Sequence, residues 1–209
     1  GLLQLFTLLL IGVFVVLKTE PLARLAAAGL RSLNGQSTRL ASALDIRWLG
    51  FSYIAFRLIH TLRDRQTGRL PGVSLQEYVN YVIFFPAVTA GPIDRLERFI
   101  GDLRKPSNLD SGQFVAGGKR LLAGLFRKFV LADALALIAL NATNASQVSS
   151  SGWTWVLLYA FAFQIYFDFS GYCDIALGVA CLFGIRLAVN FRQPYLSFNP
   201  QEIWRRWHI

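Results

Sequence analysis

The chain has 209 residues, of which 54% are hydrophobic and 16% charged, and its mean hydropathy is +0.43. Soluble domains are about 45–50% apolar and about a quarter charged, so the composition favours a membrane protein over a soluble helical protein with an apolar core. The net charge of +9 comes from basic residues that flank apolar runs, which argues against nucleic-acid binding and for cytoplasmic loops that attract anionic lipid.

The chain opens with an uncharged apolar run, "GLLQLFTLLLIGVFVVL" (1–17). As a helix it would be about 26 Å long, close to the ~30 Å hydrocarbon core of a bilayer. A signal peptide would carry a basic start and a small-residue cleavage pattern, and neither is present. Because the chain also contains no Met, we expect a truncated transmembrane helix here and a chain that is one membrane-embedded piece, 1–209, of a longer polytopic protein.

Residues 18–45 form a basic, Ala/Ser-rich connection that we expect to lie at the membrane interface as a short amphipathic helix. The next segment, "IRWLGFSYIAFRLIHTL" (46–62), is apolar except for Arg57 and His60, which are three residues apart and share one helical face. That face should pack against protein or water rather than lipid.

The stretch "LQEYVNYVIFFPAVTAGPIDRLERF" (75–99) begins as a helix and should break at Pro86 and again at Gly91-Pro92. Backbone that is not helical is tolerated at membrane depth only inside protein or along a cavity, so this segment is a candidate re-entrant loop. Residues 119–140 begin with basic residues and continue as an apolar run, which predicts an interfacial helix that leads into a span.

Residues 141–152, "NATNASQVSSSG", are polar and uncharged, which places them opposite the basic segments 119–128 and 186–206 by the positive-inside rule. The 33 residues between, 153–185, would form a helix of about 50 Å. This length predicts one crossing followed by a break at Ser170-Gly171.

Two carboxylates, Asp168 and Asp174, lie among apolar and aromatic residues in "QIYFDFSGYCDIALG". An ionised carboxylate is costly at bilayer depth unless it is paired or hydrated, so both are candidates for function. The alternative is a structural role, in which each accepts hydrogen bonds from an arginine or a neighbouring helix end.

The last residues, "SFNPQEIWRRWHI", predict a helix that starts at Pro200, because Asn199 is a good N-cap and Glu202 follows three residues later. On that helix Glu202 can pair with Arg206. His208 could handle a proton near neutral pH, or the helix could be an interfacial anchor with an incidental histidine.

The remaining polar groups offer less chemistry. His60 has Arg57 and Arg63 three residues on either side and reads as an interfacial or packing residue. Cys173 and Cys181 fit neither a redox pair nor a zinc site, and no metal-ligand spacing, phosphate-binding glycine loop or nucleophile elbow is present.

Three motifs in this order, "FFPAVTAGPIDRLERF", "QIYFDFSGYCDIALGVACLFGIRLAVNFRQPYL" and "NPQEIWRRWHI", resemble the membrane-bound O-acyltransferase family, and "GFSYIAFRLIH" adds to the likeness. The resemblance covers most of residues 46–209. It is strongest to the bacterial branch that acylates polysaccharides, as in alginate O-acetylation and teichoic acid D-alanylation.

The resemblance implies an all-α, polytopic transmembrane bundle with broken or re-entrant helices around a tunnel, in a bacterial inner membrane. An acyl thioester, from acetyl-CoA or an acyl carrier protein, would enter from the cytoplasm, and the hydroxyl of a polysaccharide or a lipid-linked acceptor from the other side. No bound cofactor is implied.

The family's W-x-R-W-H motif matches Trp204, Arg206, Trp207 and His208, which makes His208 the candidate catalytic residue. The histidine most often held to be the base lies downstream of Ile209 in the family, so this chain alone is expected to be inactive. The residues expected to contact substrate are Trp204, Arg205, Arg206, Asp168 and Asp174.

Two other functions fit intramembrane acids and helices broken at Gly and Pro. One is a transporter or flippase of an envelope precursor. The other is a subunit that scaffolds a separate acyltransferase.

Overall fold

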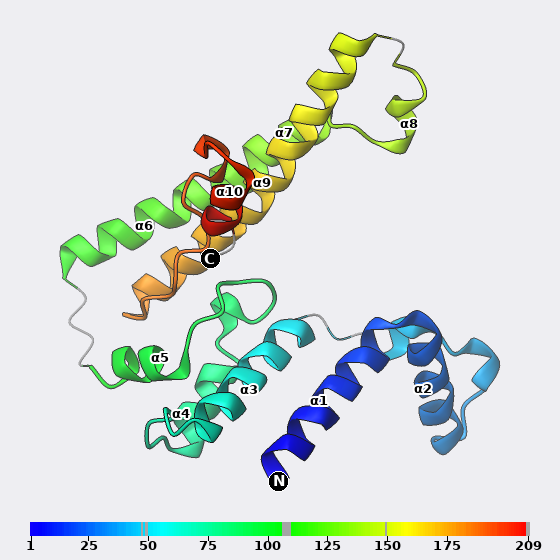
Figure 1. Cartoon of the computed structure of the whole chain (residues 1–209), viewed down its shortest axis with the longest axis vertical. Helices are drawn as coiled ribbons and strands as arrows, with labels where there is room; N and C mark the ends of the chain where they lie inside the picture. Colours follow the sequence, from blue (N-terminus) through cyan, green and yellow to red (C-terminus); the bar gives the residue numbers. More distant parts are fainter. Residues whose placement is uncertain (47, 49, 106–109, 149, 208–209) are drawn as a thin grey trace. The chain divides into compact units, whose positions relative to one another are not determined.

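The computed structural model describes residues 1–46, 48, 50–105, 110–148 and 150–207, and its regular structure is helical (Figure 1). Within those residues no strand forms, and one isolated antiparallel bridge joins Phe191 to Trp207. The predicted all-α class is confirmed. The chain divides into two compact units, Gly1–Thr89 with Arg95–Ile100, and Ala90–Asp94 with Gly101–Ile209.

The first unit begins with the two helices predicted within residues 1–45. The helix predicted for residues 46–62 follows, and after it the helix that starts at residue 75 and ends before Pro86. Its elements are α1 (Leu2–Lys18), α2 (Glu20–Leu33), the 3-10 turns η1 (Thr38–Leu40) and η2 (Ala43–Ile46), α3 (Phe51–Gln66), α4 (Leu75–Val82), η3 (Phe85–Ala87) and most of α5 (Leu96–Leu103).

The second unit is built around one long helix. Its elements are α6 (Ser111–Phe126), the π-helical segment η4 (Arg127–Ala132), α7 (Asp133–Ala136), α8 (Ala142–Ala145), α9 (Ser151–Leu182), the 3-10 turn η5 (Pro194–Leu196) and α10 (Pro200–Arg206). The helix predicted for 119–140 is present, but it begins earlier, at Ser111, and runs without interruption through η4 and α7.

The connection between α2 and α3 is held by an exposed ion pair. The Nε of Arg31 on α2 lies 2.6 Å from the Oδ2 of Asp45 in η2. The hydrogen bond from Arg31 holds the pKa of the Asp45 carboxyl below its usual range. The pair thereby ties the loop back onto the amphipathic helix predicted here.

Arg57 explains how the non-helical stretch after α4 is stabilised. Its guanidinium is buried and donates from Nη1 to the carbonyls of Tyr81 (3.3 Å) and Val82 (3.0 Å) and from Nη2 to that of Ala87 (2.9 Å). Carbonyls at the end of a helix have no partner within the helix, and an arginine fork can satisfy several of them. The predicted break at Pro86 is confirmed, and Arg57 packs against protein as expected.

Replacing Arg57 with methionine should lower the free energy of unfolding by about 2–3 kcal/mol, because the buried carbonyls of α4 and η3 lose their donor. Denaturant unfolding of the full-length protein in detergent, followed by circular dichroism, measures this. The matched control is Arg65→Met, an exposed position on the same helix, where we expect a change within about 0.5 kcal/mol. Equal losses at both positions would contradict the role assigned to Arg57.

The predicted break at Ser170-Gly171 is wrong. Helix α9 continues through both residues for 32 residues, about 48 Å at 1.5 Å per residue. Both residues are buried, and a Cβ built on Gly171 would lie 2.8 Å from the backbone nitrogen of Lys128. Gly171 therefore serves close helix packing rather than a turn.

The pair formed by α6 and α9 is joined by small residues. Gly117 approaches Gly178 and Gly124 approaches Gly171, and a Cβ on Gly124 would lie 2.6 Å from the nitrogen of Ile175 and 2.7 Å from the oxygen of Gly171. Large apolar side chains such as those of Leu122 and Phe129 face outward. Small residues inside and large apolar residues outside are typical of helices that pack within a membrane.

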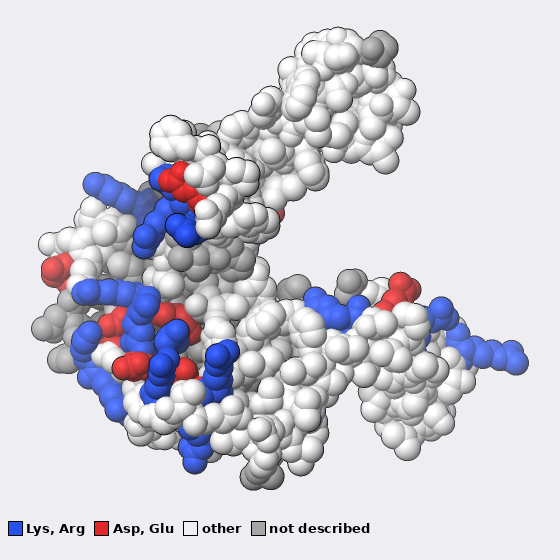
Figure 2. Space-filling view, viewed as in Figure 1, with Lys and Arg blue, Asp and Glu red and all other residues white. Residues whose placement is uncertain are grey.

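Among the described residues, one helix, α9, is long and apolar enough to cross a membrane, and α1 with α2 meets the same measure as a pair bent by 98°. The polytopic arrangement stays a prediction. Within the second unit, Figure 2 shows the end near α8 without charged side chains and basic side chains near α10. This distribution agrees with the prediction that residues 141–152 lie on the side of the membrane opposite the basic segments. Which side is cytoplasmic stays a prediction.

Candidate functional site

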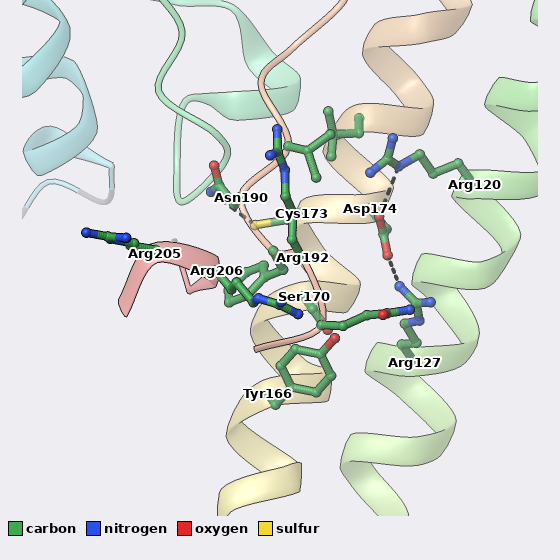
Figure 3. A pocket seen from close by; sticks show the side chains of 14 residues that line it. Arg120, Arg127, Tyr166, Ser170, Cys173, Asp174, Asn190, Arg192, Arg205 and Arg206 are labelled. Atoms are coloured by element: carbon green, nitrogen blue, oxygen red, sulfur yellow. Dashed lines mark hydrogen bonds and ion pairs between the residues drawn. The ribbon is translucent and has the colours of Figure 1, made fainter. Parts of the chain in front are cut away.

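The second unit contains a cavity of about 630 Å³ between α9, the end of α6 with η4, and the chain that leads into α10 (Figure 3). Its lining is polar and rich in arginine. The lining residues are Arg120, Arg127, Tyr166, Ser170, Cys173, Asp174, Leu177, Val189, Asn190, Phe191, Arg192, Gln193, Arg205 and Arg206.

Asp174 is the single carboxylate of this lining and is held by two arginines of the facing helix. Arg120 donates from Nε to Oδ1 over 3.0 Å, and Arg127 donates from Nη1 to Oδ2. Arg120 and Arg127 are seven residues apart, so both lie on the face of α6 and η4 that carries Gly117 and Gly124. The close glycine contacts bring the two guanidinium groups within reach of the carboxylate.

The π-helical segment η4 begins at Arg127. A π-helical turn widens the helix locally and is frequent at functional sites. The next residue, Lys128, pairs with Asp168 rather than with Asp174. The two acids of α9 are therefore bound by different cations.

The segment after α9 is folded back over the helix by hydrogen bonds and aromatic contacts. The amide of Arg192 donates to the carbonyl of Arg206 over 3.0 Å. The rings of Phe191 and Trp207 lie 5.3 Å apart, and Tyr166 of α9 contacts both, at 5.8 and 5.9 Å between ring centroids. This cluster places the arginines of α10 on the rim of the cavity.

Helix α10 forms as predicted. The Asn199 side chain accepts a hydrogen bond from the amide of Glu202 over 2.8 Å, Pro200 is the first helical residue, and Glu202 pairs with Arg206. The hydrogen bond from the amide of Phe198, together with Arg206, lowers the pKa of the Glu202 carboxyl. Glu202 therefore stays ionised at neutral pH and fixes one of the two rim arginines.

The floor of the cavity carries neutral polar groups. Asn190 is buried and its amide nitrogen lies 3.5 Å from the Sγ of Cys173. Ser170 is 3% exposed, and its hydroxyl has no hydrogen-bond partner among the described residues. Buried hydroxyl groups are normally paired, so this one is available to a molecule in the cavity.

The charge of the lining is strongly positive. The lining contains five arginines (Arg120, Arg127, Arg192, Arg205 and Arg206) and one carboxylate, which gives a formal charge of 5 − 1 = +4. Within the described residues, neither Arg192 nor Arg205 has an ion pair. Guanidinium groups bind phosphate and carboxylate through paired hydrogen bonds, so the cavity suits a polyanion.

Only some of the residues predicted to contact substrate line the cavity. Asp174, Arg205 and Arg206 line the cavity. Asp168 and Trp204 are not among the lining residues; the Asp168 side chain is 56% exposed beside Lys128, and Trp204 is 77% exposed. Their assigned role in substrate binding stays a prediction. His208 lies outside the described residues.

The sequence analysis did not identify Arg120, Arg127, Arg192, Ser170 or Asn190 as parts of a site. For the first two a signal was present, because Gly117, Arg120, Gly124 and Arg127 repeat with helical spacing on one face. For Arg192 and Asn190 there was none, since an irregular segment has no period. Among the described residues, no three His, Cys, Asp or Glu side chains gather as metal ligands.

Comparison with known proteins identifies the family of the chain. Residues 3–209 match the model of the membrane-bound O-acyltransferase family. The chain is 31% identical over 201 residues to a teichoic acid D-alanyltransferase of Streptococcus thermophilus, covering 93% of this chain and 45% of that protein.

The names of two further relatives refer to other polymers. The chain is 34% identical over 207 residues to a probable alginate O-acetylase AlgI of Pseudomonas syringae, covering 96% of this chain and 40% of that protein. It is 38% identical over 135 residues to a peptidoglycan O-acetyltransferase of Helicobacter pylori, covering 64% of this chain and 26% of that protein. The chain thus spans less than half the length of these relatives. By its match over nearly all of its residues, the chain belongs to the membrane-bound O-acyltransferase family.

Proposed function

We propose that the whole protein transfers an acyl group, acetyl or D-alanyl, from a thioester to a hydroxyl of a cell-envelope or exported polysaccharide. Family membership and the names of the relatives support acyl transfer to a polymer. The observation that carries the proposal is the five-arginine cavity against the segment that leads to His208. A bacterial inner membrane and several crossings are part of the proposal.

The donor is a thioester attached to a phosphate-bearing group, either acetyl-CoA or the prosthetic arm of an acyl carrier protein. A formal charge of +4 around a cavity of about 630 Å³ supports this, because phosphate groups would be held by arginine forks while the thioester reaches deeper. The side that faces the donor is the cytoplasm.

In the reaction, a base removes the proton of the acceptor hydroxyl, the resulting oxygen attacks the thioester carbonyl, and the thiolate leaves and takes up a proton. The family places that base on a histidine downstream of Ile209, and His208 would orient the donor or the reacting group. No acyl-enzyme is required.

A transporter or a scaffold is less favoured, because the relatives are named as transferases. The test uses the full-length protein with radiolabelled acetyl-CoA or an acylated carrier and a polysaccharide acceptor. His208→Ala should lower the transfer rate by about 100-fold or more, as loss of an acid–base or orienting group does. An unchanged circular dichroism spectrum and melting temperature serve as the folding control. Undiminished transfer by His208→Ala would refute its assignment.

A further inference from the structure

We infer that the first unit binds the phosphate of an anionic phospholipid headgroup in a separate cavity at the C-terminal end of α3. This cavity measures about 370 Å³ and is lined by His60, Arg63, Asp64, Thr67, Arg69 and Arg95. The inference is independent of the acyl-transfer chemistry, because none of these residues lines the five-arginine cavity.

The helix itself supplies four of the six lining residues. His60, Arg63 and Asp64 of α3 and its C-cap Thr67 are separated by three, one and three residues, that is, positions i, i+3, i+4 and i+7 of one helical face, so they form one stripe at the end of the helix. The hydroxyl of Thr67 donates back to the carbonyls of Arg63 (3.1 Å) and Asp64 (3.2 Å), which ties down the end of this stripe.

The turn after α3 brings a second arginine to the stripe. Gly68 has a φ of +70°, a left-handed conformation that glycine adopts without strain. The chain reverses there, and the amide of Arg69 donates to the carbonyl of Asp64 over 2.8 Å. This is the hydrogen-bond pattern of a glycine C-cap, and it fixes Arg69 beside the last turn.

The third arginine comes from a well-packed neighbour. Arg95 precedes α5, whose Leu96, Phe99 and Ile100 are buried at 1–2% exposure. The ring of Phe99 meets that of Tyr81 at 5.5 Å, so α5 is anchored to α4. The cavity therefore has a wall set by the core of the unit rather than by a free loop.

The charge of this cavity selects an anion. Three arginines face one carboxylate, a formal charge of 3 − 1 = +2 before any contribution from His60. Within the described residues, Arg63 and Arg69 make no ion pair. Guanidinium groups bind phosphate oxygens through paired hydrogen bonds, so the side chains of Arg63 and Arg69 suit the oxygens of one phosphodiester.

The surface beside the cavity favours a lipid as the source of that phosphate. Phe56 lies four residues before His60 on the same side of α3 and is 46% exposed. In a membrane-bound family, an exposed apolar side chain one turn from a basic cavity would contact acyl chains while the cavity holds the headgroup. By the positive-inside rule, we expect the basic turn at residues 63–69 on the cytoplasmic face, whose leaflet carries anionic lipid.

The experiment measures lipid binding to the full-length protein. Delipidated protein in detergent is mixed with phosphatidylglycerol or phosphatidylcholine, and bound lipid is counted by native mass spectrometry. The intact protein should bind phosphatidylglycerol at least about tenfold more tightly than phosphatidylcholine, and Arg63→Gln with Arg69→Gln should remove most of that preference. The matched control is Arg39→Gln with Arg65→Gln, which removes the same charge outside the cavity.

Two results would overturn the inference. The first is an equal loss of phosphatidylglycerol binding in the control pair, which would mean that net charge alone attracts the lipid. The second is displacement of phosphatidylglycerol by millimolar inorganic phosphate, which would mean that the cavity recognises a free anion. Retention of the lipid in the control pair and in the presence of phosphate supports a headgroup site.

Discussion

Gly124→Ala is expected to lower the free energy of unfolding by about 1–3 kcal/mol, the range typical of overpacking. The new Cβ would lie 2.6 Å from the nitrogen of Ile175 and 2.7 Å from the oxygen of Gly171, and both are backbone atoms of α9. Backbone atoms within a helix cannot turn aside as the end of a side chain can. The two helices would have to separate, and the contacts along their whole interface would weaken.

The matched control is Gly118→Ala on the same helix, where a Cβ meets nothing within 4 Å. Alanine is the better helix former by about 1 kcal/mol, so this variant should be unchanged or more stable. Gly171→Ala should behave like Gly124→Ala, because its Cβ would lie 2.9 Å from the oxygen of Gly124. Detergent-solubilised full-length protein, unfolded with a denaturing detergent and followed by circular dichroism, gives the three values.

The sign of the change in unfolding free energy tests whether the backbones of α6 and α9 are in close contact. If Gly118→Ala and Gly124→Ala change stability alike, helix propensity alone explains the data and the backbone contact between α6 and α9 is refuted. Opposite signs at two glycines of one helix have no explanation in propensity.

These glycines also show where sequence analysis succeeds and where it stops. Helix ends that are set by residues adjacent in the sequence were predicted well. Asn199 caps α10, and the helix α4 ends before Pro86. The reason is that capping and proline geometry act over three or four residues. Such information is present in the local sequence.

The Ser170-Gly171 prediction failed because the same two residues can end a helix or line its packed face. Which one happens depends on Gly124, and its contact with Gly171 is a property of the folded pair of helices. Length and loop charge favoured a break, whereas a continuous helix of about 48 Å allows α9 to extend beyond the ~30 Å hydrocarbon core. Tertiary packing therefore decided against the local expectation.

Only part of the candidate site was predicted, because here too the folded structure decides which residues meet. Asp168 and Asp174 look alike in the sequence, since both are acids among aromatic residues of one helix. Being six residues apart, they project at different angles, and they meet different cations on η4 and α6. The structure thus assigns Asp174 to the cavity, and that assignment has a measurable consequence.

Asp174→Ala is expected to raise the donor KM of the full-length protein about tenfold or more, which corresponds to ~1.4 kcal/mol of lost binding. Without the carboxylate, Arg120 and Arg127 have no shared acceptor and repel each other across the face of α6 and η4. The guanidinium groups that we propose to bind the donor phosphates would then no longer be held in place before the donor arrives. Steady-state kinetics at varied donor concentration measure the effect.

The free energy of unfolding of Asp174→Ala should fall only moderately. The side chain of Asp174 is 12% exposed, but those of Arg120 and Arg127 are 38% and 42% exposed, so water screens the charges that are left. We expect a loss of about 1–2 kcal/mol, below that of a fully buried pair. Asp168→Ala is the matched comparison on the same helix, and because its carboxylate is 56% exposed we expect a change within about 0.5 kcal/mol and an unchanged donor KM.

Asp174→Asn separates charge from shape, because an amide keeps the size of the side chain and one acceptor oxygen but cannot neutralise two guanidinium groups. If the carboxylate acts by holding the arginines, the asparagine variant should resemble the alanine variant in donor KM while retaining more of the stability. If instead both variants lower kcat and leave the donor KM unchanged, the arginines do not bind the donor, and the cavity would have to receive another anion.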